Sequence, residues 1–85
     1  MPEVTTKVVQ VQYYALLREE RGLRQEECAT AADTSGELYE QLKNKHHFSL
    51  AKKHMAVAIN DEFSTWDTPI NNGDTVVFIP PIAGG

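Results

Sequence analysis

The chain has 85 residues, of which 41% are hydrophobic and 24% charged, and its formal net charge is −4. This length suits one domain with a modest core and leaves little room for an enclosed active site, which argues against a self-contained enzyme. The negative charge and the lack of a basic patch argue against nucleic-acid binding, and no apolar run approaches the ~20 residues of a membrane span.

The residues that bear on compartment and metal binding point to a cytoplasmic protein without a bound metal. The first seven residues lack the apolar stretch of a signal peptide, and the single cysteine, Cys28, has no partner for an internal disulfide. The histidines His46, His47 and His54 do not have the spacing of metal ligands. We expect Cys28 to be a small packing residue and the histidines to be solvated or to lie at a helix end.

The N-terminal third predicts two strands joined by a short helical segment. Residues 7–14 alternate in part between β-branched or aromatic and polar side chains, which favours a strand. Residues 15–21 are rich in helix formers and Gly22 follows as a stop, so we expect a short helix or a wide turn. Residues 25–31 are a weaker strand candidate, which we expect to pair with the first strand.

A capping-box spacing marks the start of the main helix, predicted over residues 35–45. In this motif the Thr34 hydroxyl would accept a hydrogen bond from the Glu37 amide, and the Glu37 carboxylate would reach back. An apolar stripe of helical period follows. It consists of Leu38, Leu42 and Tyr39.

The C-terminal half predicts short strands separated by loops. Residues 56–59 form a short buried strand, residues 60–61 are a turn pair, and residues 62–66 form a brief strand or an extended loop. Residues 67–74 have the composition of a loop. The strongest strand is 75–79, whose nearly continuous apolar run is typical of a central strand covered on both sides.

This order of elements predicts an α+β domain, in which one main helix crosses a mixed sheet and a second helix is short. A β-grasp arrangement is the economical solution. In it, the first two strands form a hairpin and the last strand pairs centrally beside the first. We therefore assign residues 1–79 to the β-grasp domain and residues 80–85 to an extended C-terminal tail.

The tail, Pro-Pro-Ile-Ala-Gly-Gly, is the most informative segment. Pro80 and Pro81 lack N–H groups, so they end the sheet ladder and favour a stiff, extended geometry. Gly84 and Gly85 carry no side chains and can enter a narrow channel. The one distinctive group that they deliver is the α-carboxylate of Gly85, which is a poor electrophile. Because the sequence has no phosphate-binding loop, another protein would have to activate this carboxylate with ATP.

Residues 69–85 resemble the C-terminal signature of the MoaD-type sulfur carriers, the small subunits of molybdopterin synthase. The signature runs Pro–aliphatic–x–x–Gly–Asp–x–aliphatic–x–Phe–x–Pro–Pro–aliphatic–x–Gly–Gly, and this segment follows it throughout. Residues 13–22 and 56–60 resemble two further segments of the family. The departures are small: Ile59 stands where valine is usual, and tyrosine replaces phenylalanine near position 13.

The resemblance implies a ubiquitin-like β-grasp fold and a role as a sulfur donor. A MoeB-type enzyme would adenylate Gly85 with ATP and Mg²⁺, and a cysteine desulfurase or a rhodanese-like protein would supply sulfur for a thiocarboxylate. The tail would then enter the large, MoaE-type subunit, where sulfur is transferred to cyclic pyranopterin monophosphate to form the dithiolene of molybdopterin. The family assembly is a heterotetramer of two small and two large subunits. The small subunit is itself non-catalytic and binds no cofactor.

The residues before Gly85 are expected to contact the partner. For Phe78, on the predicted central strand, both core packing and partner contact are open, and we favour the core. Ile82 lies beyond the prolines, where little of this domain covers it, so we assign it to the partner. Trp66 is expected to be a satellite core residue. The partner-binding set predicted from the sequence is Phe78, Pro80, Pro81, Ile82, Ala83 and Gly84.

Other functions also fit a Gly-Gly tail. A sulfur carrier for the thiazole of thiamine or for the thiolation of transfer RNA shares the two glycines but is not expected to have the Pro-Pro-x-x-Gly-Gly ending. A ubiquitin-like modifier would form isopeptide bonds with lysines of target proteins. A plain interaction domain would leave the tail idle.

Overall fold

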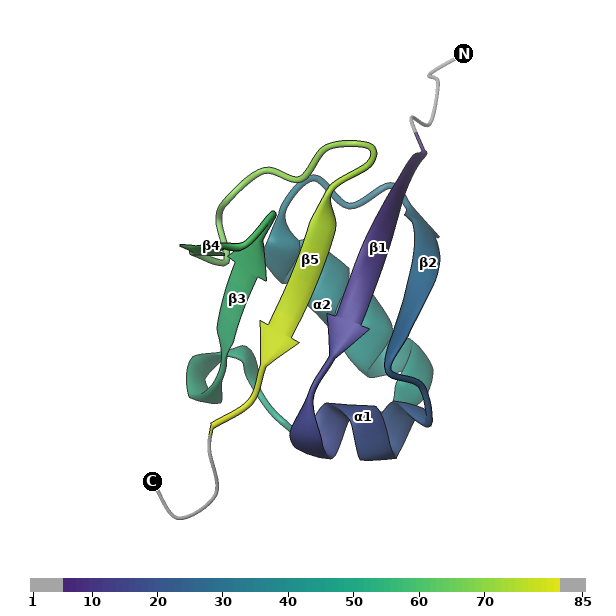
Figure 1. The fold of residues 1–85 in the computed structure, drawn as a ribbon, viewed down its shortest axis with the longest axis vertical. Coiled ribbons are helices and arrows are strands. Elements are labelled where there is room, and N and C mark those ends of the chain that lie inside the picture. Colours follow the sequence, from purple (N-terminus) through teal and green to yellow (C-terminus); the bar gives the residue numbers. More distant parts are fainter. Residues whose placement is uncertain (1–5, 82–85) are drawn as a thin grey trace.

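The structure, a computed structural model, describes residues 6–81 and shows a five-stranded mixed sheet with helices beside it (Figure 1). The strand order is β2-β1-β5-β3-β4; β1 and β5 are parallel, and the other neighbouring strands are antiparallel. The elements in chain order are β1 (Lys7–Tyr13), α1 (Ala15–Arg21), β2 (Gln25–Thr30), α2 (Ser35–His46), the 3₁₀ helix η1 (Lys52–His54), β3 (Ala56–Ile59), β4 (Glu62–Ser64) and β5 (Thr75–Ile79). This topology confirms the predicted α+β domain with the last strand beside the first.

The predicted elements are confirmed, with ends that differ by one or two residues. The first strand ends at Tyr13 because Tyr14 already serves as the N-cap of α1. The helix α1 ends where expected, since Gly22 takes a left-handed φ of 78° that other residues rarely adopt. Of the two alternatives for residues 62–66, the brief strand is observed, as β4. No helix in the described part of the chain is long and apolar enough to cross a membrane.

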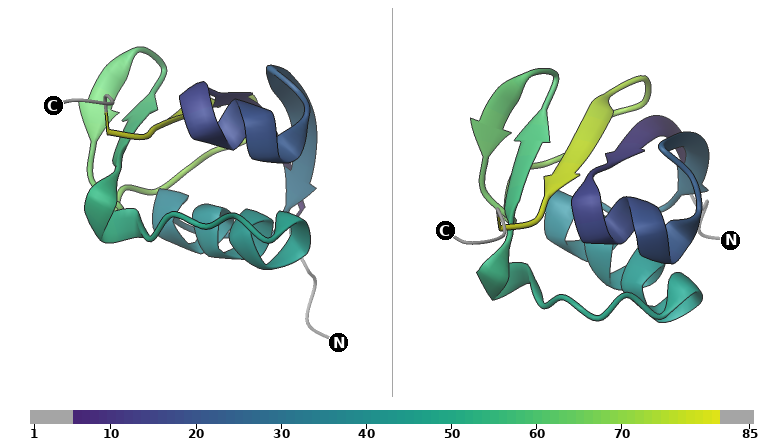
Figure 2. Two further views of the ribbon diagram at one scale, coloured as in Figure 1. Left: turned by 90° about the horizontal axis from the view of Figure 1, so that it is seen from below. Right: turned by 60° about the horizontal axis from the view of Figure 1, so that its bottom comes forward.

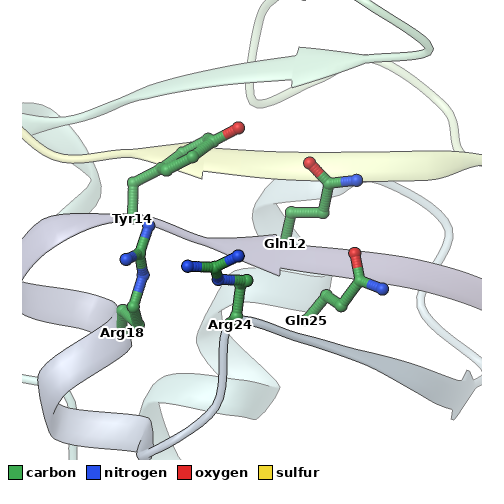
Figure 3. Close-up of a pocket in the computed structure, with 5 residues that line it drawn as sticks. All are labelled: Gln12, Tyr14, Arg18, Arg24 and Gln25. Carbon is green, nitrogen blue, oxygen red and sulfur yellow. The ribbon is translucent and has the colours of Figure 1, made fainter.

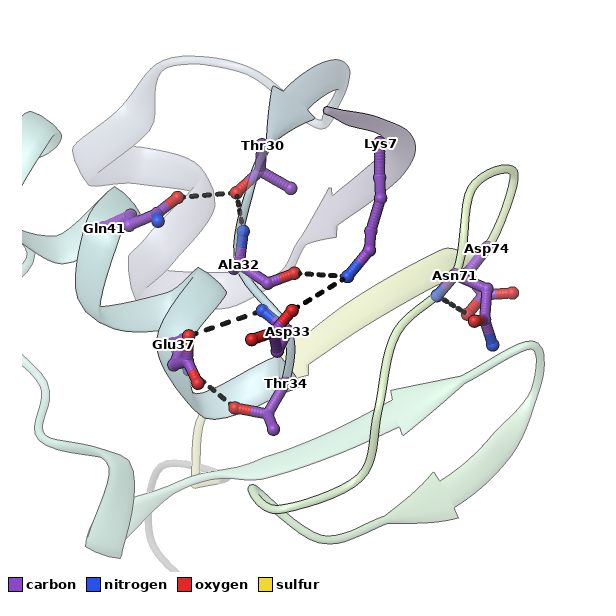
Figure 4. Close-up of polar contacts among 9 residues, drawn as sticks. All are labelled: Lys7, Thr30, Ala32, Asp33, Thr34, Glu37, Gln41, Asn71 and Asp74. Atoms are coloured by element: carbon purple, nitrogen blue, oxygen red, sulfur yellow. Dashed lines mark hydrogen bonds and ion pairs between the residues drawn. The ribbon is translucent and has the colours of Figure 1, made fainter. Parts of the chain in front are cut away.

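The capping box of α2 is present in the structure (Figure 4). The Thr34 hydroxyl accepts a hydrogen bond from the Glu37 amide, with an oxygen–nitrogen distance of 3.2 Å. The Glu37 carboxylate reaches back to the amide of Asp33 at 3.4 Å, one residue before the N-cap. The helix continues to His46, one residue beyond the prediction, and His47 follows in a left-handed conformation.

The inner face of the sheet packs on α2 and forms the core (Figure 2). Tyr39 of α2 is central, since its ring lies 5.1 Å from that of Phe78 and its hydroxyl donates to the Leu50 carbonyl oxygen at 2.7 Å. Trp66 stacks on Phe78, which confirms its satellite role in the core. The fully buried residues of this layer include Val9, Val11, Tyr13, Leu38, Tyr39, Val57, Val76 and Phe78. Each such side chain contributes roughly 1.5–3 kcal/mol of burial free energy.

The outer face of the sheet has no helix over it in the described residues (Figures 1 and 2). The expectation that the last strand is covered on both sides is therefore wrong. Val77 on this face is nevertheless only 8% exposed, because Gln12 of β1 and Ala58 of β3 lie directly beside it in the register. Neighbouring strands of the same sheet shield Val77, where the sequence analysis expected a second layer.

A hydrogen-bond network fixes the start of β5. The Asp74 carboxylate accepts a hydrogen bond from the Asn71 backbone amide at 2.8 Å (Figure 4). It also accepts one from the Asn60 side chain at 2.9 Å. The Asn60 side chain in turn accepts from the Thr75 amide at 2.9 Å. Gly73, at a φ of 89°, makes the turn that this geometry needs. The Gly-Asp pair of the C-terminal signature thus sets the register of β5, and with it the point at which the chain leaves the sheet.

Candidate functional site

The C-terminal tail begins at the end of the central strand. β5 ends at Ile79, between β1 and β3, and neither of the two prolines that follow has an N–H to continue the ladder. Pro80 is buried and Pro81 is exposed, so the chain emerges from the body of the domain at these two residues. The predicted site residues Ile82, Ala83, Gly84 and Gly85 lie outside the described residues.

A groove of about 510 Å³ lies at the base of the tail, and we call it the root groove. Its lining is mostly apolar: Tyr14, Ala15, Leu16, Glu19, Leu50, Ile79, Pro80 and Pro81. Tyr14 and Leu16 are 44% and 41% exposed, although large apolar side chains are more often buried. The place where the tail leaves the domain is therefore surrounded by apolar surface that the fold itself does not cover.

The root groove continues onto the outer face of the sheet through Ile79. Side chains alternate along β5, so Ile79 shares this face with Val77, which lies beside Ala58. Further out, on the edge strand β4, Phe63 pairs with Ala58 and is 80% exposed. Exposed apolar surface of this kind is typical of a site that binds another protein.

Phe78 does not reach this surface. Its side chain is fully buried on the inner face, with its ring 5.1 Å from that of Tyr39 and 6.1 Å from that of Trp66. Of the two roles considered for Phe78, the observed position is that of a core residue. Phe78 is therefore removed from the predicted partner-binding set. Ile79, which the sequence analysis did not select, faces outward instead. The two-residue alternation of β5 was the available signal, since a buried Phe78 turns Ile79 to the other face.

Two polar links hold α1, which contributes one wall of the root groove. At its C-terminal end, Arg21 donates two hydrogen bonds of 2.8 Å to the Glu26 carboxylate, which also accepts from the Tyr13 hydroxyl at 2.7 Å. One residue earlier, the Glu20 carboxylate accepts from the Ser49 amide and hydroxyl, at 3.1 and 2.7 Å. The helix is thereby tied both to β2 and to the segment that follows α2.

The cluster around Glu26 changes the pKa values of its members. Hydrogen bonds from Arg21 are the main reason why the pKa of Glu26 falls to about 2. Burial first, and then the hydrogen bond to Glu26, raise the pKa of Tyr13. Burial lowers the pKa of His46, whose Nε2 lies 4.0 Å from a Glu26 oxygen. Glu26 therefore stays ionised and Tyr13 stays protonated at neutral pH, which keeps the link between α1 and β2 intact.

The described residues present exposed apolar surface and no cluster for metal binding. Residues 6–81 contain no group of three His, Cys, Asp or Glu side chains that could hold a metal ion. Cys28 packs half-buried against the core, as expected for a small packing residue, and burial raises the pKa of its thiol. Its thiol therefore stays protonated at neutral pH, the less reactive form.

Comparison with known proteins shows which family combines this fold with these segments. The model of the ThiS family matches residues 11–85. The chain belongs to the ThiS family. A relative from Haemophilus influenzae, a molybdopterin synthase sulfur carrier subunit, is 30% identical over 81 residues, which cover 92% of this chain and all of that protein. The resemblance found in the sequence is confirmed.

Solved structures share the fold of this ThiS-family chain. SAMP1 from Haloferax volcanii has a TM-score of 0.74 at 24% identity, over 92% of this chain and 99% of that one. A chain in the complex of subunits 1 and 2 of the molybdopterin-converting factor from Helicobacter pylori has a TM-score of 0.61 at 26% identity, with coverages of 92% and 99%. A Caldiarchaeum subterraneum ubiquitin has a TM-score of 0.63 at 14% identity, with coverages of 95% and 100%. These likenesses confirm the ubiquitin-like β-grasp fold.

The ThiS-family match contains the root groove and Phe63. It begins at Val11, inside β1, and runs through α1, β4 and β5 to the end of the sequence. Every residue that lines the root groove, and the exposed Phe63 as well, therefore lies within the part of the chain that the ThiS family shares.

Proposed function

We propose that this chain is the sulfur-carrier subunit of a molybdopterin synthase. The observation that carries the proposal is the root groove, because the chain leaves the sheet through two prolines beside uncovered apolar surface, and Gly84 and Gly85 follow in the sequence. Membership of the ThiS family and the Haemophilus influenzae relative support it. A protein docked on the root groove would be in place to receive the tail.

In the proposed chemistry, the α-carboxylate of Gly85 is the group that reacts. The ordinary pKa of such a carboxylate, ~3.5, leaves it ionised at neutral pH. On a MoeB-type enzyme, a carboxylate oxygen attacks the α-phosphate of Mg²⁺-bound ATP, so that pyrophosphate leaves and a glycyl adenylate forms. The terminal sulfur of a persulfide on a desulfurase or a rhodanese-like donor then attacks the acyl carbon, and AMP leaves. A thiol next cleaves the S–S bond of the resulting acyl disulfide, which leaves the thiocarboxylate on Gly85 and a disulfide on the thiol partner.

The large, MoaE-type subunit then receives the charged tail. The thiocarboxylate sulfur attacks cyclic pyranopterin monophosphate, and water then hydrolyses the resulting thioester, which leaves the sulfur on the pterin and returns Gly85 to its carboxylate. Two such transfers build the dithiolene of molybdopterin. The likeness to a chain of the Helicobacter pylori complex of subunits 1 and 2 supports a large-subunit partner. We expect a cytoplasmic heterotetramer of two small and two large subunits, in which the acids and bases of the reaction belong to the large subunit.

In the proposed reaction, the residues of this chain bind the partner protein and deliver the C-terminal carboxylate to it. Residues 1–79 form the body, and residues 80–85 form the tail. Pro80 and Pro81 restrict the direction of the tail, because their rings fix φ. Gly84 and Gly85 let the backbone approach a reacting centre closely, because they have no Cβ. The root groove and the outer face supply the contact area that holds the partner during transfer.

A C-terminal extension tests this function directly. Adding one residue after Gly85 should abolish sulfur transfer to the pterin precursor by the reconstituted two-subunit enzyme, because the carboxylate moves away from the reacting centre. The melting temperature should stay unchanged, since residues 6–81 are the same. The matched control adds one residue before Met1 and should keep full transfer. Full activity of the C-terminally extended chain would overturn the proposal.

Intact-mass analysis of the protein from its native host separates the alternatives. A species in which one terminal oxygen is replaced by sulfur supports a sulfur carrier, and loss of molybdenum-cofactor synthesis on deletion of Gly84 and Gly85 assigns it to this pathway. Loss of thiamine synthesis or of transfer-RNA thiolation would assign it elsewhere. Conjugate ladders that vanish when Gly85 is deleted would identify a ubiquitin-like modifier. Normal growth and no ladders would mean an idle tail.

A further inference from the structure

A second pocket lies beside the root groove and has the opposite chemical character (Figure 3). It lies where β1 ends, between α1 and the start of β2, and has a volume of about 340 Å³. We call it the arginine pocket. It is lined by Gln12, Tyr14, Arg18, Arg24 and Gln25. Two positively charged side chains and two amides line it, and no acidic side chain is among these residues.

Neither arginine of the pocket has a carboxylate partner within residues 6–81. The ion pairs in this part of the chain involve Lys7, Arg21, His46 and Lys52. Arg21, one turn along α1 from Arg18, shows the usual pattern, since its guanidinium binds the Glu26 carboxylate at two points. Arg18 and Arg24 have no such contact in residues 6–81, and Figure 3 shows their guanidinium groups turned toward the same space.

The side chain of Arg18 contacts an aromatic ring, but one of its hydrogen-bond donors has no acceptor within residues 6–81. Its guanidinium carbon lies 5.9 Å from the centre of the Tyr14 ring, within the range of a cation–π contact. Its Nε is buried and has no hydrogen-bond acceptor in the described residues. A buried donor without an acceptor costs about 1–3 kcal/mol, and two neighbouring cations repel each other. An anion between the two arginines would offset their repulsion.

The position of the pocket favours an anion that is carried by a protein. Tyr14 lines the arginine pocket and also the root groove. Gln12, on the other wall, pairs in register with Val77 of the outer face. The pocket thus lies at the edge of the apolar docking surface, where interfaces carry the charged pairs that set orientation and specificity. Guanidinium groups match the geometry of a carboxylate, which they bind at two points.

We propose that the arginine pocket receives a carboxylate side chain, from Asp or Glu, of the protein that docks on the root groove. This inference rests on the proposed function only in that a partner docks there. The apolar groove supplies contact area, and the arginine pocket fixes the rotation of the carrier about its tail.

The binding test uses Arg18→Gln, Arg24→Gln and the double variant, with the large subunit of molybdopterin synthase from the same source as the partner. The matched control is Lys45→Gln, which removes the same charge from the exposed surface of α2. We expect the double variant to raise Kd about tenfold or more at low ionic strength, and the control to change it less than about twofold. Arg24→Lys should recover part of the loss, because it keeps the charge without the planar fork. A double variant that binds like Lys45→Gln would overturn the proposal.

An anion titration tests the pocket without any partner. The Nε–H signals of Arg18 and Arg24 are followed by NMR while acetate is added, and inorganic phosphate is added in a parallel experiment. Shifts of both signals with acetate support a carboxylate site, whereas no shift with acetate overturns it. Shifts with phosphate alone, together with an unchanged Kd of the double variant, would make it a phosphate site and would also overturn the proposal. If the wild type does not bind the large subunit, the proposed function fails, and the acetate titration alone decides the pocket.

Discussion

The two faces of the sheet are formed by the same strands but differ in how their side chains are covered. On the inner face, Val76 and Phe78 of β5 are fully buried under α2. On the outer face, alternate residues of the same strand, Val77 and Ile79, lie in a surface that no helix covers in the described residues, and Phe63 at its edge is 80% exposed. The comparison teaches that the buried core and the proposed binding surface are separated by side-chain direction within one strand, and not by separate parts of the chain.

The strongest test of this separation is a pair of matched aromatic truncations. Phe78→Ala should cost about 3–5 kcal/mol of unfolding free energy, because it leaves a cavity in the core between Tyr39 and Trp66. Phe63→Ala should change this free energy by less than about 0.5 kcal/mol, because the side chain is already in solvent. Denaturant titration measures both. If Phe78→Ala does not fold, Phe78→Leu should show a smaller loss in the same direction. Equal costs at positions 63 and 78 would contradict the separation.

A comparison of two glutamates on β2 should show the next largest effect on the free energy of unfolding. Glu26 faces inward and its carboxylate accepts hydrogen bonds from Arg21 and Tyr13. Glu27, one residue on, faces outward, and within residues 6–81 its carboxylate accepts a hydrogen bond from the Gln10 side chain alone. Glu26→Gln should cost about 1–3 kcal/mol at neutral pH, because it weakens a charged hydrogen-bond cluster, and Glu27→Gln should cost less than about 0.5 kcal/mol.

The pH dependence of stability tests whether the ionised form of Glu26 is the stabilising one. Folding lowers the pKa of Glu26 from 4.5 to about 2, so its stabilisation is present above pH 4.5 and is lost as pH falls toward 2. The difference in unfolding free energy between wild type and Glu26→Gln should therefore shrink over this window, as measured by denaturation at a series of pH values. A difference that is constant between pH 6 and about 2 would argue against the ionised cluster.

The outer face is tested by binding, with a smaller effect. Phe63→Ala should weaken binding to the large subunit about tenfold while leaving the thermal unfolding curve in place, since a large exposed aromatic anchor is lost. Isothermal titration calorimetry measures the affinity. Glu62→Ala, its exposed neighbour on β4, is the control and should bind as the wild type does. A tenfold loss in the control as well would mean that the edge strand has been disturbed.

The smallest expected effect concerns the cap of α2, which supports the inner face alone. Thr34→Ala should cost about 1 kcal/mol, because the Glu37 amide loses its acceptor, and Thr34→Ser should keep most of the stability. Affinity for the large subunit should not change in either variant. An equal cost for serine and alanine would show that the hydroxyl does not act as the cap.

Local signals in the sequence were enough to predict the five strands and the two α-helices, but not the 3₁₀ helix η1. The Thr34 and Glu37 spacing located α2, Gly22 located the end of α1, and the run of residues 75–79 identified the central strand. Each signal depends on a few neighbouring residues and on backbone geometry. The order of elements then left one economical topology, and the structure has it.

The site was less predictable, because it depends on how distant segments meet. The tail could be identified from the sequence alone. The root groove could not, because it brings together the start of α1, the segment after α2 and the end of β5, and no local sequence pattern predicts that these segments meet. The arginine pocket likewise arises because α1 places Arg18 beside Arg24 of the following loop. The prediction that the last strand is covered on both sides was wrong. A run of apolar residues does not show whether a helix or the neighbouring strands shield a residue such as Val77.

The parallel pairing of β1 with β5 has a consequence for synthesis on the ribosome. The first strand made must wait for the last, since the register joins Gln10 to Thr75 and Tyr13 to Phe78. A chain whose synthesis has not reached β5 therefore keeps one edge of β1 unpaired, and the sheet closes only when β5 has emerged. Under the proposed function, an unfinished molecule would lack Val77 and Ile79 of the outer face and would not compete with finished molecules for the partner.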